Sequence, residues 1–468
     1  MKRFSFFTFA VLFCLALMQV GSSGCANIIP PSGGPRDSLP PKLVIALPKD
    51  SATNVSTNKI VLTFNEYVDV KELSENLIVS PVPKTVPTID YKLRNVTIKL
   101  RDSLEPNTTY SINFGNSIKD VNEGNIAKGF TYVFSTGNKL DNNSFYGKVL
   151  LAENGKVDTA LLVLLHRNLS DTAIIKLAPR YYTKLNRDGS FLFKNLPQGI
   201  FNVFVLPNEY SKKYDDSTKL FAFADSAVKI SANTREVILY AYEQAKKKAA
   251  PPANASAPTQ PKAAPEKRLR YTASLEGGRQ DLLTNSIKLE FNRKLTSFDS
   301  TKIILTDTNY QPIKDYTVSL DTTGKKISIT KNWKEDTQLR ILIQKDAVAD
   351  SAGTNLTKAD TIKFATKKET EYGSIKLRFN NLNTARNPVL QIVKNNEIFE
   401  SIVLTQKEFS RKLYPPGEYE LRVLFDANKN GIWDAGDYKL KKQPEIVKQL
   451  DKKLSIRANW DNENEITL

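Results

Sequence analysis

The sequence TNKIVLTFN at residues 57–65 returns as TNSIKLEFN at residues 284–292. In the second copy Ile287, Leu289 and Phe291 are separated by charged side chains, so apolar and polar residues alternate. Because successive side chains of a β-strand point to opposite faces of its sheet, this period of two predicts a strand with one buried face. The repeat therefore indicates a β-protein with at least one duplicated module.

The duplication extends well beyond this strand. Residues 96–136 are matched by residues 325–366, with a spacing that drifts by only a few residues. A second kind of module also recurs, because residues 197–203 (PQGIFNV) correspond to residues 415–421 (PPGEYEL). Self-similarity on this scale indicates duplication with small loop insertions. The order of the chain is therefore module A, module B, a linker, module A′ and module B′.

All four modules have the pattern of short strands. Turn signals such as Asp188-Gly189 and Gly324 interrupt the alternating segments about every ten residues, and no long segment has a helical period. Evenly spaced short strands predict antiparallel sandwiches. We therefore expect an all-β fold of tandem antiparallel β-sandwich modules in two duplicated halves. The expected boundaries are 41–138 for A, 141–243 for B, 269–368 for A′ and 370–468 for B′.

The two halves are separated by a stretch rich in Pro, Ala and Lys at residues 244–268. Proline prevents regular helix and sheet, and Pro-rich chain adopts an extended conformation. This segment is therefore predicted to be a semi-rigid linker.

The N-terminus has the order of a secretory signal. Residues 1–3 carry two basic side chains, residues 4–20 are mostly apolar, and residues 21–24 are small. This order predicts a signal peptide over residues 1–24.

Cys25 follows these small residues directly. The segment resembles a bacterial lipobox, although Ser22 stands where that motif usually has Leu. The resemblance implies that Cys25 is acylated, becomes the mature N-terminus and anchors the chain to a membrane through lipid. Residues 25–40 would then be a tether. The alternative is an ordinary signal peptide followed by an incidental cysteine.

The composition excludes several classes of site. The chain has one histidine, His166, and two cysteines, Cys14 and Cys25, both near the N-terminus. These counts exclude a disulfide framework, a Cys/His zinc site and a cysteine nucleophile. His166 follows an apolar run, and we interpret it as a strand residue near a sheet edge. We predict no catalytic and no cofactor-binding residues, and no enzymatic activity.

The net charge of the chain is +17. The basic residues are spread along the sequence. They are not interleaved with aromatic residues, whereas such interleaving is typical of single-strand nucleic-acid binding. We therefore interpret the lysines as solvating surface charge and expect no nucleic-acid partner.

The sequence DANKNGIWDAGD at residues 426–437 has the ligand order of a calcium loop. Side-chain oxygens fall at positions 1, 3, 5, 9 and 12, with Gly431 at position 6 and a backbone carbonyl at position 7. The alternative is an Asx/Gly turn that needs no ion. Two features depart from the pattern, since position 12 is Asp instead of Glu and the flanking segments are predicted strands. The candidate ligands for calcium are Asp426, Asn428, Asn430, Ile432, Asp434 and Asp437.

Module A resembles the bacterial Ig-like domain of the SbsA-like, S-layer type. The resemblance rests on Pro40-Pro41, the strand at 60–65, the sequence LEPNTTY at 104–110 and the closing segment 120–136. Module B, with DGSF at 188–191 and LPQGIF in the following segment, resembles the carboxypeptidase-regulatory or collagen-adhesin B-like sandwich. The whole chain looks like an Ig-like-domain lipoprotein of Bacteroidetes type.

These observations favour a non-enzymatic cell-envelope lipoprotein whose sandwiches lie in series and form a modular stalk or interaction scaffold. The alternative is an adhesin, or a protein- or polysaccharide-binding accessory protein of a surface complex. The expected partners are the membrane, through the lipid anchor, and envelope proteins or polysaccharide of unknown identity. We expect an outer-membrane location. The first charged residues after Cys25 are Arg36 and Asp37. Because no acidic run follows the cysteine, the periplasmic face is favoured over the cell surface.

Overall fold

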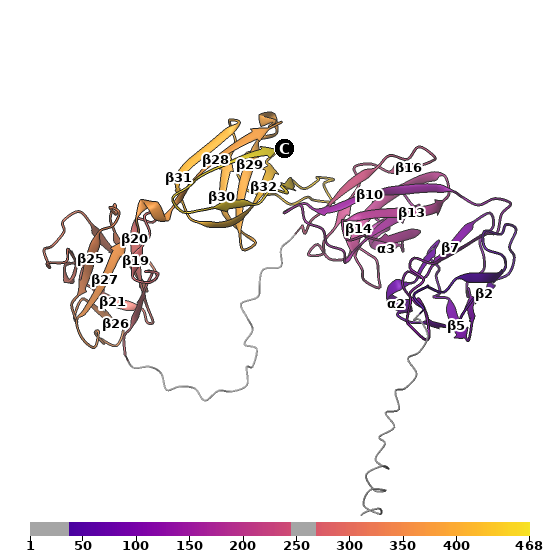
Figure 1. Ribbon diagram of the computed structural model, residues 1–468, viewed down its shortest axis with the longest axis horizontal. Coiled ribbons are helices and arrows are strands. Elements are labelled where there is room, and N and C mark those ends of the chain that lie inside the picture. The colour runs from indigo at the N-terminus through magenta and orange to yellow at the C-terminus, as the bar shows by residue number, and fades with distance from the viewer. Residues whose placement is uncertain (1–36, 245–267) are drawn as a thin grey trace, which may run out of the picture. The chain divides into compact units, whose positions relative to one another are not determined.

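The computed structural model describes residues 37–244 and 268–468 (Figure 1). The predictions for the signal peptide, Cys25, most of the tether and most of the linker concern residues outside these ranges. Strands make up nearly all of the regular secondary structure of the described residues, and the α-helices α2 (Leu73–Asn76) and α3 (Ala173–Lys176) are four residues each. The predicted all-β fold class is confirmed. No helix among the described residues is long and apolar enough to cross a membrane.

The chain divides into two compact units, with the division after Asn142. The first unit contains module A, in which two layers enclose one core. Phe64 and Phe134 come from different sheets and are both buried in that core. One sheet contains, in spatial order, β1 (Leu43–Leu47), β2 (Lys59–Phe64), β6 (Asn95–Lys99) and β5 (Thr88–Lys92). The other strands are β4 (Ile78–Ser80), β7 (Thr109–Asn113) and β9 (Thr131–Ser135) in one sheet, and β3 (Val68–Val70) with β8 (Ile118–Asp120) in a two-stranded ribbon.

Module A′, in the second unit, repeats this order of strands and adds one short strand at the edge of its second sheet. Its first sheet contains β18 (Tyr271–Ala273), β20 (Ser286–Phe291), β24 (Lys326–Thr330) and β23 (Thr317–Leu320). The others are β19 (Arg279–Gln280), β27 (Asp360–Thr366), β25 (Gln338–Ile343) and β22 (Ile303–Thr306) in one sheet, and β21 (Leu295–Phe298) with β26 (Val348–Asp350) in a ribbon. In β20 the side chains of Ile287, Leu289 and Phe291 are buried while Lys288 and Glu290 are exposed. The alternation therefore sets which face of the strand meets the core.

Module B is a sandwich of two sheets. The smaller sheet contains β13 (Ser190–Leu196), β10 (Asn143–Leu151) and β17 (Val237–Ala241). The larger contains β12 (Tyr181–Lys184), β11 (Leu161–His166), β14 (Gly199–Pro207) and β15 (Ala222–Phe223), and β16 (Val228–Ile230) also pairs with β14.

Module B′ has the same topology as module B. The smaller sheet contains β31 (Glu408–Tyr414), β28 (Gly373–Asn380) and β35 (Asp461–Thr467). The larger contains β30 (Glu397–Val403), β29 (Pro388–Lys394), β32 (Gly417–Phe425), β33 (Ile446–Gln449) and β34 (Leu454–Ile456). The closing strand pairs parallel to the first strand in both modules, so these sandwiches are not purely antiparallel.

Strand β11 of the larger sheet of module B is buried on both faces. All six residues of β11 are buried. Leu161, Val163 and Leu165 face the sandwich core, whereas Leu164 and Phe204 belong to a second apolar cluster. A strand buried on both faces needs a cover on its outer face as well. That cover comes in part from module B′, as described below.

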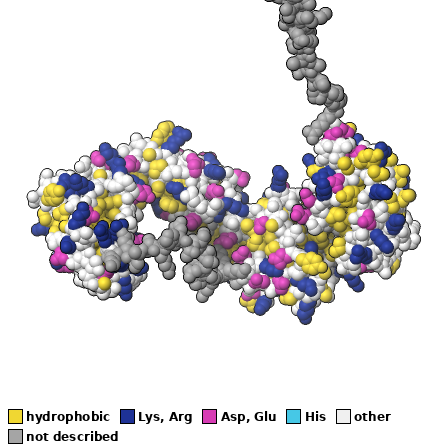
Figure 2. Space-filling view, turned by 90° about the horizontal axis from the view of Figure 1, so that it is seen from below, with side chains coloured by type: hydrophobic (Ala, Val, Ile, Leu, Met, Phe, Trp, Pro, Cys, Tyr) yellow, Lys and Arg dark blue, Asp and Glu magenta, His cyan; other side chains and the backbone are white. Residues whose placement is uncertain are grey.

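Charged side chains are mixed on the surface. On the face that Figure 2 presents, lysine and arginine side chains lie among aspartate and glutamate side chains and apolar residues. This mixture agrees with the interpretation of the basic residues as solvating charge.

Candidate interaction site

The predicted calcium loop is the first part of a longer connection, residues 426–445, which joins β32 to β33 and which we call the B′ loop. Asp426 is only 2% exposed at the end of β32. Its carboxylate accepts backbone N–H groups of Lys429 at 2.6 Å and Gly431 at 2.7 Å. Gly431 has a positive φ of 79°, which glycine adopts readily. The chain therefore wraps around the Asp426 carboxylate.

Three further predicted ligands lie together. The side-chain amides of Asn428 and Asn430 both donate to Asp434 Oδ2, in the second case at 2.8 Å. Ile432 is exposed, and the Asp437 carboxylate instead accepts N–H groups of the residues that follow it. Among the described residues, no three His, Cys, Asp or Glu side chains form a metal-binding group. Calcium binding by the loop stays a prediction.

Glu445 closes the loop, and the sequence analysis did not single it out. Its carboxylate is buried and accepts the N–H groups of Ala427 at 2.8 Å and Asp434 at 3.1 Å. Its backbone carbonyl accepts the Trp433 indole N–H at 2.7 Å. The one sequence feature that could have pointed to Glu445 is its position as an acidic residue directly before strand β33. The spacing of residues along the chain does not show what its side chain contacts.

The far part of the B′ loop leaves its own module and packs on module B. Tyr438 is 5% exposed. Its ring centroid lies 5.0 Å from that of Phe221, 5.1 Å from Phe223 and 5.9 Å from Phe204, in edge-to-face geometry. Its hydroxyl donates to the backbone carbonyl of Asp171 at 2.9 Å. The aromatic ring from module B′ therefore covers part of the outer face of the larger sheet of module B.

Polar contacts surround this ring. Lys441 Nζ lies 2.6 Å from the Asp171 carboxylate and 4.0 Å from the centroid of the Tyr438 ring. The Gln443 side-chain amide donates to the carbonyl of Phe223 at 3.0 Å and to the Asp225 carboxylate at 2.7 Å. The contact is thus apolar at its centre and polar at its rim, the usual composition of a specific interface.

The backbone also joins the two modules. The Val447 N–H donates to the carbonyl of Ala152 at 2.9 Å. A Cβ placed on Gly155 would lie 2.8 Å from the Val447 carbonyl oxygen, so the two chains approach more closely than a side chain allows. Lys156 Nζ adds a hydrogen bond to the Asn396 side chain at 2.9 Å.

His166 is the last residue of β11, so it is a strand residue as interpreted, and β11 is next to the edge strand β12 of its sheet. β11 lies between β12 and β14, and His166 pairs with Asn202 of β14. Its ring packs edge-to-face on Phe204 at 5.5 Å, and Nε2 is buried without a hydrogen-bond partner among residues 37–244 and 268–468. Burial lowers the pKa of the imidazole to about 4. The residue is therefore neutral at physiological pH and part of the packed outer layer.

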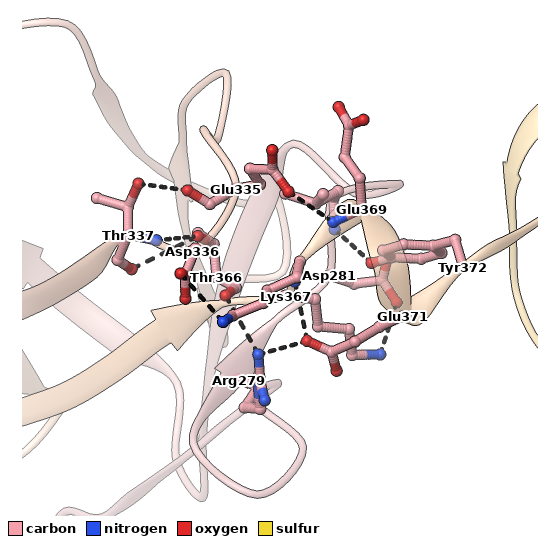
Figure 3. Close-up of polar contacts among 12 residues, drawn as sticks. Arg279, Asp281, Glu335, Asp336, Thr337, Thr366, Lys367, Glu369, Glu371 and Tyr372 are labelled. Carbon is pink, nitrogen blue, oxygen red and sulfur yellow. Dashed lines mark hydrogen bonds and ion pairs between the residues drawn. The ribbon is translucent and has the colours of Figure 1, made fainter. Parts of the chain in front are cut away.

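A second polar cluster joins module A′ to module B′ (Figure 3). The Tyr372 hydroxyl donates to the Asp281 carboxylate at 2.7 Å and accepts the Leu282 N–H at 2.9 Å. Arg279 forms an ion pair of 2.5 Å with Glu371. Burial alone would raise the pKa of Asp281, but hydrogen bonds from the backbone, from Tyr372 and from Lys367 hold that pKa below its ordinary value. The cluster fixes residues on both sides of the short connection between the modules.

Comparison with known families identifies one module. The model of the bacterial Ig-like domain matches residues 37–136, which overlaps nearly all of module A, predicted at 41–138. Module A is therefore similar to the bacterial Ig-like domain family. None of the curated proteins compared matches the chain.

Among solved structures, the chain is similar to the major pilin subunit BcpA of Bacillus cereus, with 10% identity, 70% of this chain and 99% of that chain covered, and a TM-score of 0.17. It is also similar to the Bacillus anthracis TIE protein, with 11% identity, 94% and 75% coverage and a TM-score of 0.17. The N-terminal part of the bacterial S-layer protein SbsC is 14% identical, with 43% of this chain and 44% of that chain covered and a TM-score of 0.16. Similarities at this level carry no argument about function.

Proposed function

We propose that the chain is a non-enzymatic cell-envelope lipoprotein that serves as an interaction scaffold. The observation that supports this most is the contact that the B′ loop makes with module B. The side chains of this loop bond to each other or to module B through Tyr438, Lys441 and Gln443. Residues arranged in this way stabilise contacts between modules.

The contact changes the expected arrangement of the scaffold. Modules in series would contact only their neighbours in the sequence. Module B instead contacts module B′ directly, although module A′ lies between them in the sequence. The second unit is thus held by a long-range contact as well as by the A′–B′ cluster.

Zero-length carbodiimide crosslinking of the full chain tests this contact. The reagent joins a lysine amine to a carboxylate that is already in contact with it. We expect an intramolecular link between Lys441 and Asp171, identified by mass spectrometry. Its absence, with other close pairs such as Lys219 with Asp215 linked normally, would contradict the contact.

The location is tested separately. If Cys25 carries the anchor, radiolabelled palmitate marks the wild-type protein and the protein sediments with outer membranes. Cys25→Ser should remove both the label and the sedimentation. Protease treatment of intact cells then distinguishes the proposed periplasmic face, where the protein resists digestion, from the cell surface.

A further inference from the structure

A cleft of about 300 Å³ lies between modules B and B′, beside the contact described above. Module B contributes Glu153 and Glu243 to its lining. Module B′ contributes Gln391, Ser401 and Trp433. The cleft exists only because the two modules are held together, so it could not be found in either module alone.

The base of the cleft contains a buried polar group without a partner. Gln391 is 2% exposed, and its Oε1 accepts no hydrogen bond from the part of the chain that the structure describes. An unpaired buried carbonyl oxygen destabilises a protein, because its hydrogen bonds to water are lost and not replaced, so such groups are rare. A ligand that donates a hydrogen bond to this oxygen would satisfy it.

A matching donor lies beside it. Arg422 of β32 is opposite Gln391 of β29 in the sheet, and its buried Nε–H is also without an acceptor. The other end of its guanidinium is bonded to Glu420 at 3.1 Å. A hydroxyl group both donates and accepts, so a single hydroxyl can satisfy the Gln391 oxygen and the Arg422 N–H together.

The remaining lining fits the same chemistry. The carboxylates of Glu153 and Glu243 accept hydrogen bonds, and the Ser401 hydroxyl can donate or accept. Trp433 and the exposed side chain of Ile398 provide apolar surface. Several polar groups that converge beside an aromatic ring suit a ligand with many hydroxyls and one apolar face.

We propose that this cleft binds a neutral saccharide unit. The proposal rests on the proposed scaffold function and gives it a ligand class, a polysaccharide of the envelope or of a neighbouring surface. Hydroxyls of the sugar bond to Gln391 and to the two glutamates, and the carbon–hydrogen face of the ring lies against Trp433.

The test is an array of neutral, acidic and amino-sugar oligosaccharides with basic peptides as further probes, followed by calorimetric titration of the full mature chain. We expect binding to one or more neutral oligosaccharides. Gln391→Leu should weaken this binding at least tenfold, because the substitution removes the buried acceptor without opening a cavity. Glu243→Gln should weaken it less, since the amide oxygen still accepts.

Two controls separate the possible failures. Glu236→Gln, an exposed glutamate that does not line the cleft, should bind as the wild type does. The Lys441–Asp171 crosslink reports the module contact in every variant. Three results would refute the saccharide site while the scaffold stands, provided that the wild type is crosslinked. The wild type binds no neutral oligosaccharide, it binds only basic peptides, or Gln391→Leu binds the oligosaccharide as tightly as the wild type does. If the crosslink is absent from the wild type, the proposed module contact itself fails.

Discussion

His166 shows how one buried titratable residue makes the stability of the second unit depend on pH. Its folded pKa is about 4 because burial disfavours the charged imidazole, whereas an unfolded chain has the ordinary value of about 6.5. Between these two values the unfolded state binds a proton that the folded state does not. Stability is therefore lost as the pH falls from 6.5 toward 4, and is fully present above 6.5.

We predict that the free energy of unfolding of the wild type falls by up to about 3 kcal/mol between pH 7 and pH 4 because of His166, and that this decrease is absent in His166→Leu. The measurement is urea unfolding of both proteins across this range, with the difference between them as the readout. Carboxylates contribute their own pH dependence equally to both proteins. A difference that does not change with pH would show that the imidazole is not sequestered.

Tyr438 tests the contact between modules at the level of one side chain. Tyr438→Ala removes a buried ring, and truncations of large aromatic residues typically destabilise by about 3–5 kcal/mol. Tyr438→Phe keeps the ring and removes only the hydrogen bond to Asp171, an effect of about 1 kcal/mol. We predict that the Lys441–Asp171 crosslink is lost in the first variant and retained in the second. Equal crosslinking in both would mean that the ring does not hold the modules together.

At the scale of the element, the B′ loop combines two tasks. Its first part is closed by hydrogen bonds to Asp426, Asp434 and Glu445, and its second part docks on module B. Because the same segment carries both, an ion that stiffens the first part also restrains the second.

We predict that millimolar calcium raises the melting temperature of the full chain, in the weak range typical of extracellular calcium sites. Asp434→Asn should remove most of this increase, because it takes away a charged oxygen to which two other predicted ligands bond. Magnesium at the same concentration is the control for ionic strength. An unchanged melting temperature would leave the loop as an Asx/Gly turn.

At the scale of the whole molecule, the direct contact between modules B and B′ means that the covalent link between the two halves is not their only connection. We predict that a chain with a protease site inserted within residues 245–267 still elutes as one species after cleavage. The same cleaved chain carrying Gly436→Val should separate into two fragments. A Cβ at position 436 would lie 2.6 Å from Tyr242 Cζ and 2.8 Å from the Lys442 carbonyl oxygen, so the docked loop cannot accept it. Lys439→Ala, exposed on the same loop, is the matched control.

Much of the architecture could be predicted from local patterns. The alternation around Ile287 indicates a strand with one buried face, and the recurrence of whole segments indicates duplicated modules, which the matching strand orders of A with A′ and B with B′ support. The apolar run before His166 indicates a strand, but which strands flank it depends on pairing with residues far along the chain. Likewise the position of Asp426 in a polar turn follows from the sequence, whereas the role of Glu445 does not.

The sequence by itself therefore determined the β class, the module order and the polar loop at 426–437, because each of these depends on residues that are neighbours along the chain. Only the tertiary structure decided that Tyr438 lies on module B and that Gln391 lies at the base of a cleft with Glu243. These contacts join residues of two separate sandwiches. The periodicity of the local sequence does not indicate which residues pair across the two sandwiches. The free energy that selects these contacts comes from burying two complementary surfaces against each other.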